Sequence, residues 1–152
     1  MADAGPLARS PVAGLPQGWT DLSLIPKWRI FEEPSPFCAV GHAIRGTAGL
    51  TWSVSPGQWS VLGSRPEGAH VVDLAHVWAM VSIPETVALE ALPKVCALDF
   101  DARVFPEGRA ARTAVAGIAT EIVRMEGALL LATSRSYGGY LTEALISATG
   151  TP

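Results

Sequence analysis

The apolar residues of this chain lie in short runs that proline and glycine separate. The 152 residues include 15 glycines and 12 prolines. The apolar stretches Val71–Ile83 and Ala110–Ala119 are interrupted by Asp73, His76 and Arg112. A helix that crosses a bilayer needs about 20 nearly uninterrupted apolar residues. The pattern therefore argues against a membrane span and indicates several short strands and helices.

Charged residues are scarce for a chain of this length. They make up 16% of the sequence, against about 25% in typical globular domains. A domain of this size keeps about 30% of its unfolded surface exposed after folding, and that surface is normally rich in charge. The composition therefore predicts one compact domain, much of whose surface is covered by partner proteins.

The net charge and the N-terminal sequence bear on the expected binding partners and on the expected cellular compartment of the protein. The net charge is −3, and the only lysines are Lys27 and Lys94. Without a basic stripe to neutralise phosphates, nucleic acid is not an expected partner. Residues Met1–Pro16 lack the apolar core of a secretory signal, so we expect a cytoplasmic protein. Cys38 and Cys96 are far apart, which favours reduced thiols.

The chain divides into a lead-in and one domain. Residues 1–20 contain Pro6, Pro11 and Pro16 among glycine, alanine and serine, with no period of 2 or 3.6. Such a composition is typical of a disordered or extended N-terminal segment. We expect residues 21–149 to form a single domain.

Alternating and β-branched apolar runs predict that strands outnumber helices. Ser55–Gly57 and Glu126-Gly127 are expected turns between strands. His70–Leu74 and His76–Ile83 are apolar enough to suit inner strands. The predicted strands are Lys27–Phe31, Phe37–Arg45, Leu50–Val54, Gln58–Leu62, His70–Leu74, His76–Ile83, Ala111–Ala119, Thr120–Met125 and Ala128–Thr133.

Two helices complete the expected fold. Ser82 and Glu85 have the spacing of a capping box, which predicts a helix start at Ser82. Pro93 makes continuation of that helix beyond Leu92 doubtful. A second helix closes the chain, with Ser134 or Ser136 as its N-cap. The residues expected on one face of this helix are Tyr137, Tyr140, Leu141, Ala144, Leu145 and Ala148. This order predicts an α+β fold of antiparallel sheets with a few packed helices.

The residue inventory predicts no catalytic, cofactor-binding or metal site in this chain. His42, His70 and His76 lie on three predicted strands, without cysteines or carboxylates at ligand spacing. The G-x-S-x-G pattern of a nucleophile elbow is absent. Asp99 is expected to cap a turn.

Glycines and tryptophans offer two further features. Gly138 and Gly139 open the last helix, where they permit either anion binding beside Arg135 or close packing, and we favour packing. Of the five tryptophans, Trp52, Trp59 and Trp78 lie in predicted strands and are expected in the core. Trp19 and Trp28 lie in or beside the lead-in and are candidates for an interface.

Four blocks of the sequence, in order, resemble the gamma subunit of heterotetrameric sarcosine oxidase. They are Trp52–Trp59, Val71–Leu74, Cys96–Thr113 and Ser134–Leu141. The block with Leu98-Asp99-Phe100 and the later Phe-Pro-Glu-Gly is the most specific. The blocks span about two thirds of the chain. The stretch from Val72 to His76 also resembles the wider folate-binding superfamily of the glycine-cleavage T-protein.

The resemblance implies a T-protein-like folate-binding-domain fold and a role as a non-catalytic accessory subunit. The implied complex is a cytoplasmic flavoprotein oxidase or dehydrogenase that oxidatively demethylates sarcosine or a related N-methyl amine. It further implies alpha and beta partner subunits that carry FAD, FMN, NAD and tetrahydrofolate, and a small delta subunit that holds zinc. No cofactor is expected in this chain.

Contact with those partners is expected to use aromatic and arginine anchors. The predicted interface residues are Trp28, Phe105, Arg109, Arg135, Tyr137 and Tyr140. Two alternatives remain open. One is a free-standing tetrahydrofolate-binding module of the aminomethyltransferase type, with Asp73 or Arg135 at the ligand. The other is a scaffold protein of an unrelated assembly.

Overall fold

Two five-stranded antiparallel sheets and two helices make up the part of the chain that the structure, a computed structural model, describes: residues 10–31, 38–68 and 70–150. The first sheet contains, in spatial order, β1 (Thr20–Asp21), β7 (Trp78–Pro84), β10 (Ala128–Ser134), β9 (Ile118–Met125) and β8 (Arg109–Val115). The second sheet contains β3 (Ala43–Gly46), β4 (Gly49–Ser55), β5 (Gln58–Gly63), β2 (Lys27–Phe31) and β6 (Val71–Asp73). The α+β class with antiparallel sheets is therefore confirmed.

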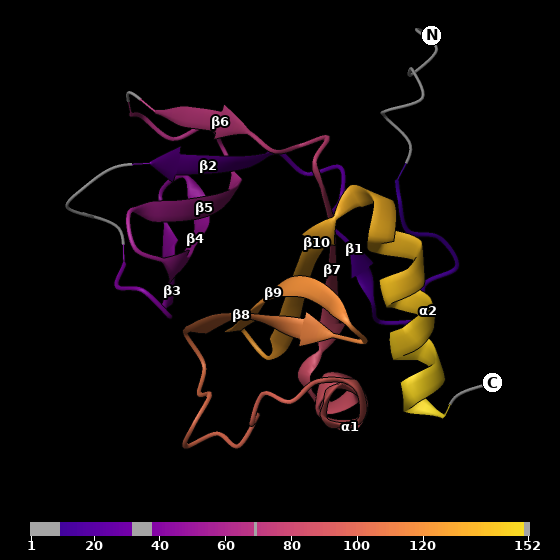
Figure 1. Cartoon of the computed structure of the whole chain (residues 1–152). Coiled ribbons are helices and arrows are strands. Elements are labelled where there is room, and N and C mark those ends of the chain that lie inside the picture. Colours follow the sequence, from indigo (N-terminus) through magenta and orange to yellow (C-terminus); the bar gives the residue numbers. More distant parts are fainter. Residues whose placement is uncertain (1–9, 32–37, 69, 151–152) are drawn as a thin grey trace, which may run out of the picture.

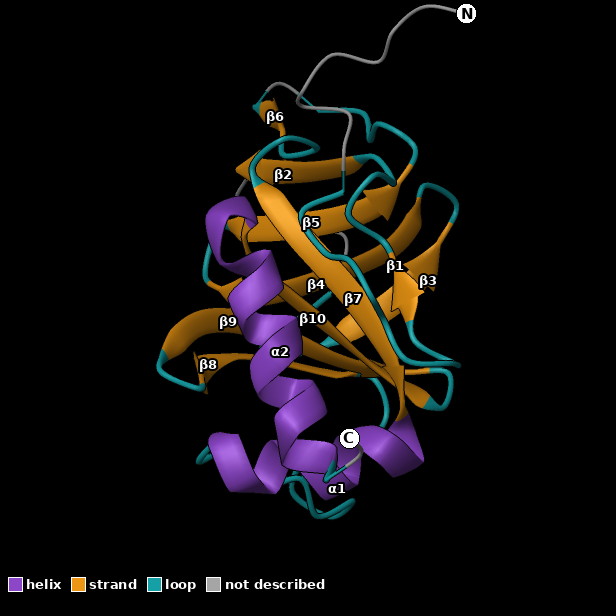
Figure 2. Ribbon diagram, turned by 90° about the vertical axis from the view of Figure 1, so that its right-hand side faces the viewer, coloured by secondary structure: helices purple, strands orange, loops and turns teal. Residues whose placement is uncertain are grey.

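The helices cover one face of the first sheet, and the second sheet covers part of the other (Figure 1). Helix α1 spans Glu85–Val95, and helix α2 spans Gly138–Thr149 after the 3-10 turn η2 at Arg135–Tyr137. Figure 2 shows α2 lying across the first sheet, with α1 at its C-terminal end. The layers are thus helices, first sheet and second sheet.

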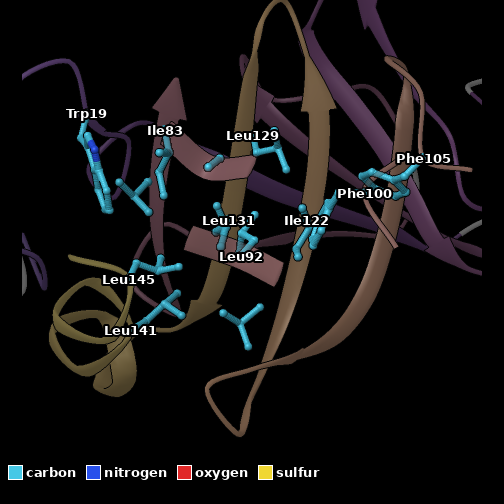
Figure 3. Packing of buried hydrophobic residues seen from close by; sticks show 13 residues of the cluster. Trp19, Ile83, Leu92, Phe100, Phe105, Ile122, Leu129, Leu131, Leu141 and Leu145 are labelled. Carbon is cyan, nitrogen blue, oxygen red and sulfur yellow. The ribbon is translucent and has the colours of Figure 1, made fainter. Parts of the chain in front are cut away.

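The main core lies between the helices and the first sheet, where Leu141 and Leu145 of α2 face Ile83, Ile122 and Leu131 (Figure 3). A second cluster fills the space between the two sheets and includes Leu50, Trp52, Met80, Val123 and Leu130. Successive side chains of a strand point to opposite faces. The central strands of the first sheet therefore need apolar residues on both faces, as the apolar run Trp78–Val81 of β7 provides.

Trp19 belongs to the main core and is 8% exposed. The ring packs in the core with residues of β7 and β10, which leaves little of it exposed for the predicted interface. Val12 is also buried. From Ser10 onward the chain lies against the domain, whereas residues 1–9 of the predicted disordered or extended segment lie outside the described residues.

Hairpins form where the sequence supplies residues that tolerate positive φ. Pro56 and Gly57 turn β4 into β5, and Glu126 and Gly127 turn β9 into β10, as predicted. Glu126 and Gly127 have φ values of 56° and 72°, the signs that a type I′ hairpin requires. A third hairpin turn, at 116–117, lies within the predicted strand Ala111–Ala119. The sequence does not signal this turn, because alanine seldom adopts the φ of 49° that Ala116 has.

Four predicted element positions are wrong. β6 is an edge strand with Val72 47% exposed, so His70–Leu74 is no inner strand. Ser82 lies in β7 opposite Leu130, and α1 begins only at Glu85. Pro93 sits inside α1, which continues to Val95. In place of Phe37–Arg45, a strand spans Ala43–Gly46, and Phe37 lies outside the described residues.

The face of the last helix also differs from the prediction. Tyr137 and Tyr140 are 52% and 57% exposed, whereas Leu141 and Leu145 are buried. The buried side continues through Gly138 and Thr142. Neither predicted serine caps the helix, because η2 lies between β10 and α2 and makes Tyr137 the N-cap residue.

Candidate functional site

A buried ion pair joins the two sheets. Arg29 of β2 donates from Nη2 to Glu121 Oε1 of β9 over 2.8 Å, and the two side chains are 15% and 6% exposed. The second carboxylate oxygen, Glu121 Oε2, accepts a hydrogen bond of 2.7 Å from Trp52 Nε1 of β4. Both carboxylate oxygens therefore have partners from the second sheet.

The Arg29 guanidinium is held on several sides. Its Nη2 also donates to Ser60 Oγ at 2.9 Å, and its Nη1 donates to Gln58 Oε1 at 3.4 Å. The guanidinium lies 4.8 Å from the ring centroid of Trp78, which is stacked against Trp52. These contacts fix the position of the Arg29 guanidinium. The ion pair thus links β2 and β9, which lie in different sheets and share no backbone hydrogen bonds.

The sheets separate beside this pair and leave a hollow of about 180 Å³. Arg29 and Glu121 lie on its floor, and Trp78, Arg112 and Ser134 line its walls. A neighbouring depression of about 360 Å³ shares Ser134 and extends to Ile118 and Tyr137. A site with fixed charges at the base and an apolar extension can hold a polar group that carries an apolar neighbour.

Neither Arg29 nor Glu121 was singled out from the sequence. Glu121 lies in the predicted strand Thr120–Met125, among apolar neighbours, and Arg29 lies between Trp28 and Ile30. A charge at an inward position of an apolar strand signals a buried pair, since an unpaired charge is costly to bury. The partners are 92 positions apart in the sequence, so the sequence does not show that these two charges pair with each other.

A separate cavity of about 410 Å³ opens between the sheets on the side of β3. Its lining is mainly apolar, with Leu22, Leu50 and Leu130 among the contributors. The exposed ion pair of Arg45 and Glu126 lies at its rim. This pair lowers the pKa of Glu126, through its hydrogen bond from Arg45 and the charge of that guanidinium.

The predicted interface residues do not form one surface. Trp28 is half-buried on β2 and donates from Nε1 to the Gly63 carbonyl over 3.1 Å, with Arg65 5.9 Å from its ring centroid. Arg109 begins β8, and its Nη1 lies 3.3 Å from His42 Nε2. Both side chains thus make contacts within the chain, and their role in binding a partner stays a prediction.

Phe105 is buried, at 3% exposure, and meets Phe100 edge to face (Figure 3). Its backbone carbonyl accepts from Arg124 Nη1 at 2.7 Å, and the same Arg124 is paired with Glu85. The Phe105 ring is thus part of the core of this chain, and its role in binding a partner stays a prediction.

The start of α2 carries the other predicted residues. Arg135 is half-buried in η2, whereas Tyr137 and Tyr140 are exposed and available for contact. A Cβ added at Gly138 would lie 2.7 Å from the Cβ of Ala79 in β7. The prediction that glycine here serves close packing is confirmed for Gly138; Gly139 has no neighbour nearer than 3.8 Å.

The acidic residues weighed as candidates have local roles. The Asp73 carboxylate accepts from the Ala75 backbone N–H at 2.8 Å, and that of Asp99 accepts from the Asp101 N–H at 2.9 Å. The prediction that Asp99 caps a turn is confirmed. Among the described residues, no three His, Cys, Asp or Glu side chains gather closely enough to hold a metal ion. None of the helices in the described part is long and apolar enough to cross a bilayer.

Two antiparallel sheets with helices on one side define the class of this domain, and comparison with known proteins shows a likeness in fold. No protein-family model and no curated protein matches the sequence. The fold is similar to that of a chain in the heterotetrameric sarcosine oxidase from Corynebacterium sp. U-96, solved in complex with pyrrole 2-carboxylate. The TM-score is 0.78 at 19% sequence identity, and the match covers 95% of this chain and 95% of that chain. The likeness shows a shared fold.

Proposed function

We propose that this chain is an accessory subunit of a multi-subunit flavoprotein oxidase or dehydrogenase. The complex would oxidatively demethylate sarcosine or a related N-methyl amine. One observation carries the proposal: the fold agrees over 95% of both chains with a chain of a heterotetrameric sarcosine oxidase. Agreement over nearly the whole of both chains supports an equivalent structural role more strongly than a shared motif would.

The finer assignment is the place of the gamma subunit, with a T-protein-like fold and no catalytic residue of its own. The four sequence blocks support this place. The polar groups described above support the non-catalytic role, because both members of the buried Arg29–Glu121 pair serve to join the two sheets. Asp73 and Asp99 likewise serve turns.

The proposed partners are larger alpha and beta subunits and a small delta subunit. Under this proposal FAD, FMN, NAD and tetrahydrofolate belong to the large subunits, and zinc to the delta subunit. The scarcity of charge supports a subunit with much covered surface. Among the described residues, ten large apolar side chains are more than a third exposed, including Leu24, Val77, Tyr137 and Tyr140, and partner subunits would cover some of them.

The test is co-expression of this chain with the flavoprotein-like proteins encoded beside its gene. We expect a tag on this chain to retain flavin-containing chains that oxidise sarcosine or an N-methyl amine. Leaving this chain out should lower the yield of assembled complex. Assembly and turnover that are unchanged without this chain would contradict the proposal.

Two controls separate an accessory from a catalytic role. His42→Ala and Asp73→Asn, introduced into the assembled complex, should leave kcat unchanged if the chain contributes no catalytic group. Calorimetric titration of the isolated chain with tetrahydrofolate should give no heat of binding. Binding in that titration would instead support a free-standing folate-binding module.

A further inference from the structure

The hollow between the sheets carries more positive charge than its own residues neutralise. Arg29 and Glu121 compensate each other on the floor. Arg112, the other cation that lines the hollow, is exposed and belongs to no ion pair within the described part of the chain. Its Cα lies opposite Glu121 in the β8–β9 register, but Glu121 already uses both oxygens elsewhere. The charged residues that line the hollow, Arg29, Glu121 and Arg112, therefore sum to a net charge of +1.

The floor also holds a donor that is unused. Arg29 Nε is buried and makes no hydrogen bond to any described residue. A buried donor without an acceptor costs free energy, and it adds to the positive character of the hollow. Arg112 is exposed and offers its donors to an anion of the size of a carboxylate, and arginine binds carboxylates in a planar, two-pronged geometry.

Apolar and aromatic groups surround this charged hollow. Val77 lines it and is 49% exposed, and Tyr137, in the neighbouring depression, is 52% exposed. Ile118 lies in the same depression. Protein interfaces combine a desolvated apolar centre with arginine and tyrosine anchors. A free anion would use the hollow alone, whereas a protein segment would cover the hollow and the apolar rim together.

We propose that the hollow receives the carboxylate of an aspartate or glutamate from a partner subunit, which pairs with Arg112. An apolar residue beside that acid would cover Tyr137 and Ile118. The inference rests on the proposed function, because it takes the occupant to be another subunit of the complex. Charge complementarity selects an acidic segment as the occupant.

The test compares variants of Arg112 in reconstitution of the complex from this chain and its partner subunits. Arg112→Gln should weaken the affinity about tenfold and Arg112→Glu about a hundredfold or more, since the latter adds repulsion. Arg103→Glu is the matched control, because Arg103 is 89% exposed in a loop outside the hollow; it should leave the affinity unchanged. Circular dichroism and the unfolding midpoint of each variant establish that it is folded.

A photo-crosslinking side chain at Ser134 identifies the occupant directly. We expect a crosslink to an acidic peptide of a partner subunit. A crosslink to a second copy of this chain overturns the proposal, as does an intact complex of wild-type affinity with Arg112→Glu. Binding of free benzoate to the isolated chain, together with that unchanged affinity, would also overturn it. If no complex forms even with the wild-type chain, the proposed function fails and this inference fails with it.

Discussion

The Arg29–Glu121 pair is a buried polar link between the two sheets. The side chains are 15% and 6% exposed, and Trp52 Nε1 satisfies the second carboxylate oxygen. Removing one partner of a buried ion pair leaves the other charge unpaired in a low-dielectric site, which costs about 3–5 kcal/mol. Replacing both partners by apolar residues costs much less. The pair should thus act as one unit in a mutant cycle.

We predict that Glu121→Ala lowers the free energy of unfolding by about 3 kcal/mol. The double variant Arg29→Met with Glu121→Leu should lose less than the sum of the two single changes. Denaturant unfolding measures all three. The control is Arg45→Ala, which removes an ion pair more than half exposed on both sides and should cost about 0–1 kcal/mol. Equal losses in E121A and R45A would refute the buried-link account.

Lys27 makes folding depend on pH in the alkaline range. The side chain is fully buried, and its Nζ donates to the Ser23 and Ile25 carbonyls at 2.6 and 2.7 Å. Burial lowers the pKa of Lys27 from 10.5 to about 8. Between these pH values the unfolded chain binds more protons than the folded chain at this site. The contribution of Lys27 to stability therefore rises with pH across this window, by about 3 kcal/mol at most.

Replacement of Lys27 by methionine should remove that contribution. The difference in unfolding free energy between wild type and K27M is expected to change from pH 7.5 to pH 10.5 in favour of the wild type. Lys94→Met, at an exposed lysine of α1, is the matched control against which the change for K27M is compared. A constant difference for K27M would mean that burial does not perturb this lysine.

At the scale of elements, α2 lies on the first sheet because its first residue has no side chain. The ideal Cβ of Gly138 would lie 2.7 Å from Ala79 Cβ and 3.2 Å from Pro11 Cβ. Distances below 3.0 Å require the helix or the strand to move. The next residue, Gly139, has its nearest neighbour at 3.8 Å, so the restriction applies to one position.

We predict opposite effects of alanine at these two positions. Gly138→Ala should lower the unfolding free energy by about 1–3 kcal/mol through overpacking. Gly139→Ala should be neutral or stabilise by up to about 1 kcal/mol, because alanine favours helix. Thermal and denaturant unfolding give both values. A neutral Gly138→Ala would show that α2 is not held against β7 as closely as the structure has it.

Elements whose signals are local could be predicted, whereas those set by distant partners could not. The hairpin turns at Pro56-Gly57 and Glu126-Gly127 can be predicted from a few neighbouring residues. Ser82 and Glu85 match a capping box, yet pairing of β7 with β10 keeps Ser82 in a strand. The Arg29–Glu121 site depends on two sheets meeting, which no local pattern encodes. The fold class was therefore predictable and the candidate site was not.

For the whole molecule, the low charge content and the fold both favour a chain whose surface is partly covered by other subunits. Only 16% of the residues are charged, and large apolar side chains remain exposed on several elements. The described part of the chain has its own hydrophobic cores. The exposed apolar side chains lie outside these cores. The low charge content and the apolar exposure are both explained if partner subunits cover these side chains in an assembly.

Native mass spectrometry of material purified through a tag on this chain tests that account most directly. The tagged chain is co-expressed with the flavoprotein-like proteins encoded beside its gene. We expect an assembly in which the 15.9 kDa chain is bound in fixed ratio to flavin-containing chains. A single species at 15.9 kDa, with the flavoproteins assembled separately, would show that this chain is not a subunit of their complex.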